Sequence, residues 1–190
     1  MERDPDGDLA KDTGIEARIE GAIDAYKAAV AAVSAGAADP PALEAVTYAL
    51  SHLGDKYWAV DSAVNPDGFS RVPADTSKCN IFVAMAYKEG AGVPYPHHSF
   101  YGICTNSPAM ANDLAYDNHV GDLEKVRGPL RLGDIVGFAP AGGRGAGHAA
   151  LYVGNGIVVY ASGTRVKARS FAWVAAFEHN NGFQAWRYPE

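Results

Sequence analysis

The amino-acid sequence predicts an α+β domain, in which helices come first along the chain and an antiparallel sheet follows. Apolar residues recur at three- and four-residue steps up to about residue 90, whereas alternating strands and Gly-rich turns begin at residue 134. Helices and strands do not alternate, which argues against a parallel βαβ sheet. The chain has 190 residues, the length of one domain with one core.

The composition is typical of a globular protein and excludes several classes of function. Hydrophobic residues make up 48% of the chain and charged residues 20%, and no apolar run approaches the ~20 residues of a membrane helix. We therefore expect no membrane insertion. The net charge is -6 and no Lys/Arg cluster stands out, so nucleic acid is not an expected partner. The two cysteines, Cys79 and Cys104, form neither a disulfide framework nor a CxxC zinc motif.

The N-terminal part predicts two helices after a flexible start. Residues 1–14 are charged and contain Gly and Pro, so we expect them to be flexible. An Ala-rich stretch with apolar residues at helical spacing predicts an additional amphipathic helix over 15–36 that lies against the core. The Asp-Pro-Pro at 39–41 is typical of a helix start, and the apolar face that follows predicts a second helix that ends at Gly54.

A loop and a third helix follow the second helix. Turn signals with little periodicity predict a loop over 59–77. Thr76 or Ser77 can cap a third helix that ends at Gly90. Cys79 then lies in the first turn of this helix, on its buried side.

Residues 91–130 are poorly periodic and rich in polar residues, and this segment is too long for a plain connection. We expect it to form part of a binding surface. A metal site could be built from its side chains, which include His97, His98, Asp117, Asn118 and His119. No helical His-x3-His spacing supports such a site, so we interpret these residues as surface or groove residues and expect no bound metal or cofactor.

The remainder of the chain predicts a meandering antiparallel sheet, because short runs of alternating apolar residues are separated by Gly-rich turns. The expected strands cover residues 134–139, 148–153, 157–162, 164–170 and 182–188.

Two residues stand out as a candidate nucleophile and base. A helix N-terminus stabilises a thiolate, and Cys79 lies at one, with Lys78 beside it to lower the thiol pKa further. The main chain at Cys79 can also donate to an oxyanion. His148 opens a strand after a Gly-rich stretch that leaves room for substrate. The alternative is a buried core thiol and a capping histidine.

Four segments resemble the NlpC/P60 and CHAP-like cysteine peptidases. ALSHLGDKYW at 49–58 resembles the helix end and tyrosine that precede the nucleophile in that family, and KCNIFV at 78–83 is similar to its Asp-Cys-Ser-Gly-Phe-Val. LGDIVGF at 132–138 and GHAALYVGNG at 147–156 are similar to its Pro-Gly-Asp-Ile-Val-Phe-Phe and Gly-His-Val-Gly-Ile-Tyr-Val-Gly-Asn-Gly segments. The resemblance covers 46–188 in the family's order.

The resemblance implies a single papain-like domain over 15–190, and a cysteine amidase or endopeptidase with Cys79 as nucleophile and His148 as base. It also implies the substrate, which in this family is the peptide stem or cross-link of bacterial peptidoglycan. The expected contacts to substrate or oxyanion are Tyr57, Trp58 and Lys78. Simple packing of the Tyr57 ring against the second helix is an equally weighted alternative.

The third member of the family's triad is usually a histidine twelve residues after the base, where this sequence has Tyr160. A two-residue turn at 155–156 would place Tyr160 on the opposite face from His148. A three-residue loop would place Ser162 opposite His148, with Tyr160 as a diagonal neighbour on the same face. We favour the longer loop, with Tyr160 as the first choice for the third residue and Ser162 as the second.

An amidase without a secretory signal is typical of an antibacterial effector, and the acidic MERDPDGDLAKD start lacks such a signal. We therefore expect delivery to a rival's periplasm or cell wall by a specialised secretion system, with a cognate immunity protein as partner. Two alternatives stay open. One is an inactive binding module of the same fold, which the altered third residue permits. The other is a thioester-based acyltransferase, which would need a more apolar groove.

Overall fold

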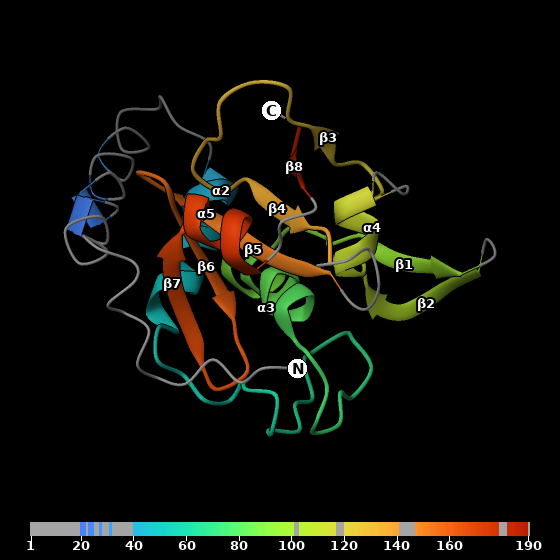
Figure 1. The fold of residues 1–190 in the computed structure, drawn as a ribbon. Helices are drawn as coiled ribbons and strands as arrows, with labels where there is room; N and C mark the ends of the chain where they lie inside the picture. Colours follow the sequence, from blue (N-terminus) through green and yellow to red (C-terminus); the bar gives the residue numbers. More distant parts are fainter. Residues whose placement is uncertain are drawn as a thin grey trace.

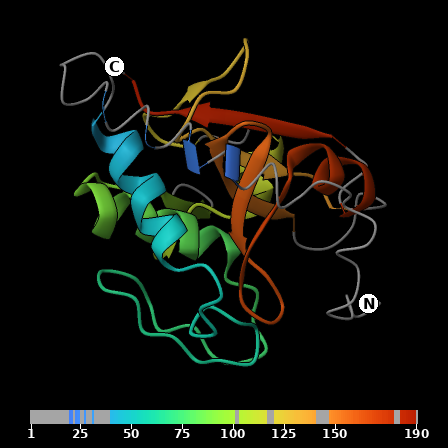
Figure 2. The same ribbon diagram turned by 90° about the vertical axis from the view of Figure 1, so that its left-hand side faces the viewer.

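The computed structural model confirms the predicted α+β class. It describes residues 20, 21, 23, 24, 27, 31, 40–100, 103–116, 120–140, 147–178 and 182–189. In these residues, a six-stranded antiparallel sheet lies between α2 and α3 on one face and α5 on the other (Figure 1, Figure 2). The papain-like fold stays a prediction. No helix in the described part of the chain is both long and apolar enough to cross a membrane.

The two predicted helices that precede the sheet are present. α2 (Pro40–Ser51) begins at the expected prolines, and α3 (Cys79–Met85) begins at the expected cysteine. α3 continues as a π-helical turn, η2 (Ala86–Gly90), which ends at the predicted glycine. A Cβ on Gly90 would lie 2.7 Å from the Tyr48 Cβ of α2. Glycine therefore allows this close approach of the two helices.

The predicted flexible segment 1–14 lies outside the described residues, as does most of the predicted helix over 15–36. The six described residues between 20 and 31 are helical. One member of the expected apolar face, Ile23, is 39% exposed, so its side chain is not buried in the core.

All five predicted strands are present, with bounds that differ from the prediction by at most two residues. The sheet has the order β3-β8-β4-β5-β6-β7. The strands are β3 (Glu124–Lys125), β4 (Ile135–Phe138), β5 (His148–Gly154), β6 (Ile157–Ala161), β7 (Val166–Ser170) and β8 (Phe183–Arg187).

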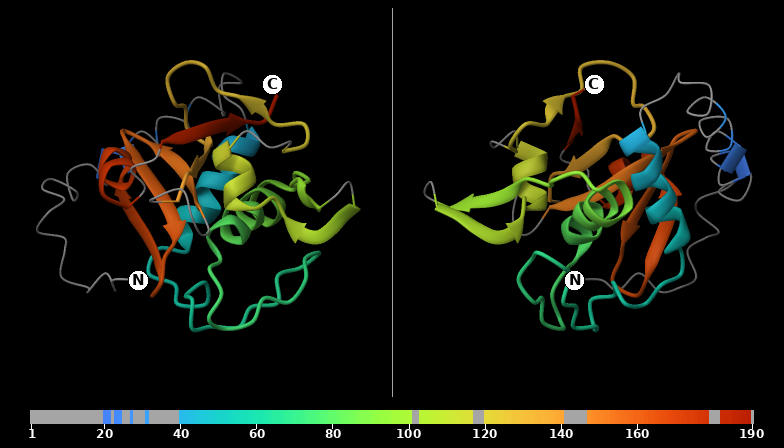
Figure 3. Two further views of the ribbon diagram at one scale, coloured as in Figure 1. Left: turned by 45° about the vertical axis from the view of Figure 1, so that its right-hand side comes forward. Right: turned by 180° about the vertical axis from the view of Figure 1, so that it is seen from behind.

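The predicted meander is correct for β4 to β7 and wrong for β8. β8 does not follow β7 in the sheet but pairs with β4 at the opposite side. The connection contains α5 (Phe171–Trp173) and the π-helical turn η4 (Val174–Glu178), and Val174 packs against Val136 and Val158. Because this connection crosses a face of the sheet, β8 reaches the free side of β4 (Figure 3).

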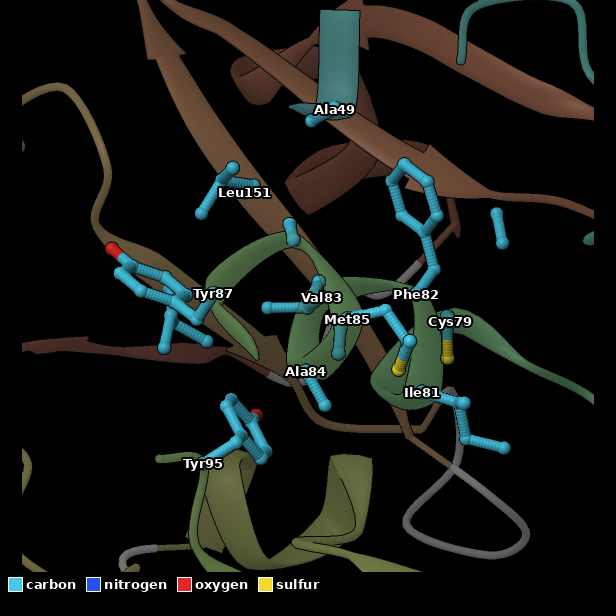
Figure 4. Packing of buried hydrophobic residues seen from close by; sticks show 14 of the residues in the cluster. Ala49, Cys79, Ile81, Phe82, Val83, Ala84, Met85, Tyr87, Tyr95 and Leu151 are labelled. Carbon is cyan, nitrogen blue, oxygen red and sulfur yellow. The ribbon is translucent and has the colours of Figure 1, made fainter. Parts of the chain in front are cut away.

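Side chains of the sheet alternate between two apolar clusters, as the pleat of a strand requires. Ala149 and Leu151 of β5 pack with α2 and α3, and Figure 4 shows Leu151 beside the buried side chains of α3. Ala150 faces the other cluster, which contains Phe138 and Tyr160. The sheet is therefore covered on both faces.

The segment 91–130, which showed no periodicity in the sequence, contains regular structure. It holds β1 (His97–Phe100), β2 (Ile103–Pro108), α4 (Ala111–Tyr116) and β3. β1 and β2 form a separate hairpin that extends from the body of the molecule (Figure 1). α4 packs on the sheet so closely that a Cβ on Gly137 would lie 2.5 Å from Leu114. These elements escaped prediction because each is too short to display a period.

Candidate active site

Cys79 is the first residue of α3, as predicted, and its side chain is only 2% exposed. The expected cap of this helix is wrong. Lys78 occupies the N-cap position, and neither Thr76 nor Ser77 makes a side-chain capping bond. The Ser77 hydroxyl instead lies 3.6 Å from the Cys79 sulfur. The hydroxyl is thus directed at the thiol and not at the helix backbone.

The Cys79 sulfur is surrounded by hydrogen-bond donors, which are the Ser77 hydroxyl and the main-chain N–H groups of Ala149, Asn80 and Cys79 itself. Burial raises the pKa of the Cys79 thiol, and these four hydrogen bonds oppose the effect of burial. The pKa of the Cys79 thiol is raised overall, whereas the position at a helix N-terminus had predicted a lowered pKa. The resting thiol is therefore protonated near neutral pH, and the same donors are placed to stabilise negative charge that develops there.

Lys78 is buried, with 1% of the residue exposed, and its ammonium points away from bulk water. Its Nζ donates to the carbonyl oxygens of Ala59 at 2.8 Å, Val60 at 3.0 Å and Thr76 at 2.8 Å. Burial lowers the pKa of Lys78, and nearby carboxylates oppose that effect. Lys78 thus ties the preceding loop to the start of α3, a structural setting that the sequence did not indicate.

His148 begins β5, as predicted, and is 9% exposed. Its ring contacts the ring of Tyr160 edge to face, with centroids 4.4 Å apart and planes at 89°. It also lies 6.1 Å from the Phe138 ring. The next residue, Ala149, donates its N–H to the Cys79 sulfur. The structure therefore brings the main chain at the start of β5 beside the thiol, while the imidazole packs against Phe138 and Tyr160.

The β5–β6 hairpin combines both of the loop geometries considered from sequence. The chain turns at 155–156, and a bulge between Tyr152 and Gly154 then shifts the pairing by one residue. Continued to the start of β5, this register places Tyr160 diagonally from His148 on the same face. The ring contact of these two residues agrees with that register.

Ser162, the second choice for the third residue, and Asp134, at the start of β4, both have structural partners. The Ser162 hydroxyl donates to the Arg165 carbonyl at 2.6 Å and accepts from the N–H groups of Thr164 and Arg165. These bonds close the turn between β6 and β7. Asp134 is fully buried and accepts two bonds of 2.7 Å from the guanidinium of Arg187. It is thus a structural anchor at the start of β4.

Tyr57 and Trp58 have contrasting settings. Tyr57 is 45% exposed, and its hydroxyl accepts a hydrogen bond of 3.2 Å from the Asn65 N–H. Trp58 is 3% exposed and its ring lies between those of Tyr57 and Phe82, with centroids 5.0 and 5.6 Å away. Tyr57 is therefore accessible to a ligand, whereas Trp58 supports the loop that carries it.

An open cavity of about 480 Å³ lies beside this loop. Its lining residues are Lys56, Asp61, Ser62, Thr164 and Arg165. The cavity is polar and adjoins the turn between β6 and β7.

No group of three or more metal-ligating side chains occurs among the described residues. His97 packs on Phe69, with ring centroids 5.4 Å apart. The side chains of His98 and Cys104 and all of residues 117–119 lie outside the described part.

Sequence reasoning missed two asparagines that hold the main chain on either side of the candidate pair. Asn80 is 8% exposed, and its Nδ2 donates to the Ala109 carbonyl at 3.1 Å. Asn112 Oδ1 accepts from the Gly147 N–H at 2.6 Å. Asn80 had a signal, because it follows the cysteine in the KCNIFV segment. Nothing in the local sequence marks Asn112.

Comparisons with solved structures give a weak likeness. No protein-family model and no curated protein matches the chain. A chain in the crystal structure of the type VI native effector-immunity complex Tae3-Tai3 from Ralstonia pickettii is similar to it, with 19% identity and a TM-score of 0.42. The match covers 78% of this chain and 98% of that chain. At this level of similarity, function has to be argued from the site itself.

Proposed function

We propose that this protein is a cysteine amidase or endopeptidase that hydrolyses an amide bond in the peptide stem or cross-link of bacterial peptidoglycan. Cys79 is the nucleophile and His148 the general base. The observation that carries the proposal is the position of the Cys79 sulfur, which lies at the start of α3 and accepts from the N–H of the residue after His148. The substrate class comes from the sequence resemblance.

The raised pKa of the Cys79 thiol implies that the thiol is neutral before reaction. As Sγ attacks the amide carbon, His148 takes the thiol proton, and the main-chain N–H of Cys79 donates to the oxyanion. The tetrahedral intermediate collapses to a thioester, and His148 gives the proton to the departing amine. Water, deprotonated by His148, then hydrolyses the thioester and regenerates the thiol.

Tyr160 is the proposed positioning residue for His148. Its ring meets the imidazole edge to face at 4.4 Å, which fixes the plane of the imidazole. Ser162 is the weaker choice, because its hydroxyl makes three hydrogen bonds within the β6–β7 turn.

The proposal is tested by incubating purified protein with peptidoglycan sacculi and identifying the released muropeptides by mass spectrometry. Wild-type protein is expected to release fragments whose new termini identify the cleaved bond, and Cys79→Ala and His148→Ala are expected to release none. Cys104→Ala is the matched control and is expected to stay active. Intact sacculi with folded wild-type protein would instead favour an inactive binding module, and transfer of an acyl group to an added amine would favour an acyltransferase.

We further propose that the enzyme acts in the periplasm or cell wall of a rival bacterium, after delivery by a specialised secretion system, and that a cognate immunity protein neutralises it. Expression in a bacterial host with an added periplasmic signal is expected to lyse the cells, and the product of a neighbouring gene is expected to protect them. Toxicity confined to cytoplasmic expression would contradict this proposal.

A further inference from the structure

The segment 109–112, at the start of α4, contacts the neighbours in sequence of both proposed catalytic residues: the side chain of Asn80 and the main chain of Gly147. Asn80 directly follows the nucleophile and donates to the Ala109 carbonyl at 3.1 Å. Gly147 directly precedes the base and donates its N–H to Asn112 Oδ1 at 2.6 Å. One short segment thus bridges the helix that carries the cysteine and the strand that carries the histidine.

The bridging segment is itself fixed to the sheet. The Met110 N–H donates to Asp113 Oδ2 at 2.8 Å, which satisfies a free donor at the start of α4. Further along α4, the Leu114 carbonyl accepts from Trp186 Nε1 of β8 at 2.7 Å. The Asp113 bond thus fixes the local start of α4, and the Trp186 bond ties a later turn of α4, outside the segment 109–112, to β8.

Gly147 packs closely against Asn112 of the segment 109–112 and against Phe138. A Cβ at this position would lie 2.6 Å from the Phe138 carbonyl oxygen and 2.8 Å from Asn112 Oδ1. Only glycine allows the main chain to approach this closely, so the backbone that leads into β5 has little freedom to shift.

We propose that Asn80 and Asn112 are positioning residues that set the separation of the Cys79 thiol from the His148 imidazole through the segment 109–112. The inference rests on the proposed function. The nucleophile and the base belong to elements far apart in sequence, so their separation depends on tertiary contacts. A displacement of about 1 Å between reacting groups can cost about 100-fold in rate.

The test uses full-length protein with Cys104→Ala, so that alkylation by iodoacetamide reports on Cys79 alone. Asn112→Ala removes the acceptor for the Gly147 N–H, whereas Asn112→Asp keeps an oxygen there. Trp186→Phe is the matched control, because it also removes one hydrogen bond to α4 but leaves the bridge intact. The measurements are the pH profile of alkylation, kcat and KM on sacculi, and Tm.

Asn112→Ala is expected to abolish the His148-dependent inflection of the alkylation profile and to lower kcat about 10- to 100-fold with little change in KM. Asn112→Asp is expected to keep most of the inflection and most of the wild-type kcat. Trp186→Phe is expected to lower Tm while keeping the inflection.

The outcomes separate this inference from the proposed function. An inflection that vanishes in His148→Ala but persists in Asn112→Ala would contradict the positioning role of the segment 109–112. It would still agree with Cys79 and His148 as the catalytic pair. If His148→Ala does not change the pH profile of alkylation, His148 is not the base for Cys79. The positioning role of the segment 109–112 would then be wrong as well. If sacculi stay intact but the alkylation profile changes in both His148→Ala and Asn112→Ala, the positioning role of the segment 109–112 is supported. Only the proposed substrate class would then be wrong.

Discussion

At the scale of single residues, the Cys79 thiol is subject to two opposing influences. Burial disfavours the thiolate, whereas the Ser77 hydroxyl and three main-chain N–H groups stabilise it. Burial is the larger effect, so the folded protein holds the thiol proton more tightly than the unfolded chain does. The resting thiol is thus neutral near neutral pH.

This difference predicts a pH-dependent contribution to stability. Because the folded-state pKa is raised, the contribution is fully present below the ordinary thiol pKa of about 8.5 and is lost as pH rises through the folded value. Wild-type protein is expected to lose Tm relative to Cys79→Ala as pH increases from about 8.5 to 10. Thermal denaturation across this range measures the difference. The raised pKa values of Tyr48 and Tyr188 do not involve Cys79, so they are common to both proteins and cancel. The pKa of Tyr95 is raised mainly by burial, which both proteins share, and to a smaller extent by Cys79 itself. Parallel curves would contradict the raised thiol pKa.

Lys78 provides a second prediction at this scale. Lys78→Met leaves the carbonyls of Ala59, Val60 and Thr76 without their shared donor, and a buried unsatisfied polar group costs about 1–3 kcal/mol. The variant is expected to lower the free energy of unfolding by roughly 2–3 kcal/mol in urea denaturation. Lys56→Met is the control, because Lys56 is an exposed lysine of the same loop. Equal stability of the two variants would show that the carbonyl contacts of Lys78 contribute little.

At the scale of elements, the β5–β6 hairpin places Tyr160 against His148. If the ring contact orients the imidazole, Tyr160→Phe keeps most of the activity, whereas Tyr160→Ala lowers kcat/KM by about 10- to 100-fold. Steady-state kinetics on sacculi or purified muropeptides distinguish the two variants. Equal losses in both would assign the role to the Tyr160 hydroxyl and not to its ring.

The elements also show which features of the fold can be predicted from local sequence. The bounds of β5 and β6 were predicted closely, because alternating apolar residues and the Asn-Gly turn are local signals. The pairing of β8 with β4 was not, because that contact joins distant segments. β1 has four residues and α4 has six, which is too few for a period to appear.

In the candidate site, too, local features were predicted from sequence and long-range contacts were not. Cys79 and His148 were proposed from residue types and flanking segments, and the structure places them at the predicted starts of α3 and β5. The role of Asn112 depends on a contact with Gly147, 35 residues away, and no local pattern reports such a contact. The upward direction of the Cys79 pKa was also missed, because sequence shows the helix start but not the depth of burial.

At the scale of the whole molecule, the proposed site draws on three segments that are joined through the sheet and α4. α3 contributes the cysteine, β5 the histidine and the segment 109–112 the link between them, while α4 is held to the sheet by Trp186. α3 and the segment 109–112 lie on the same side of the sheet as α2 (Figure 3). The His148 ring packs against Phe138 and Tyr160, which belong to the cluster on the other face. The central claim is that this assembly cleaves peptidoglycan through a thioester on Cys79.

The most direct measurement is acid quenching of the protein during incubation with peptidoglycan fragments, followed by peptide mapping and analysis of the released products by mass spectrometry. We predict a peptidoglycan-derived adduct on the peptide that contains Cys79, together with cleaved fragments, in the wild-type protein. Both are expected to be absent in Cys79→Ala. Fragment release that persists in Cys79→Ala would contradict the account.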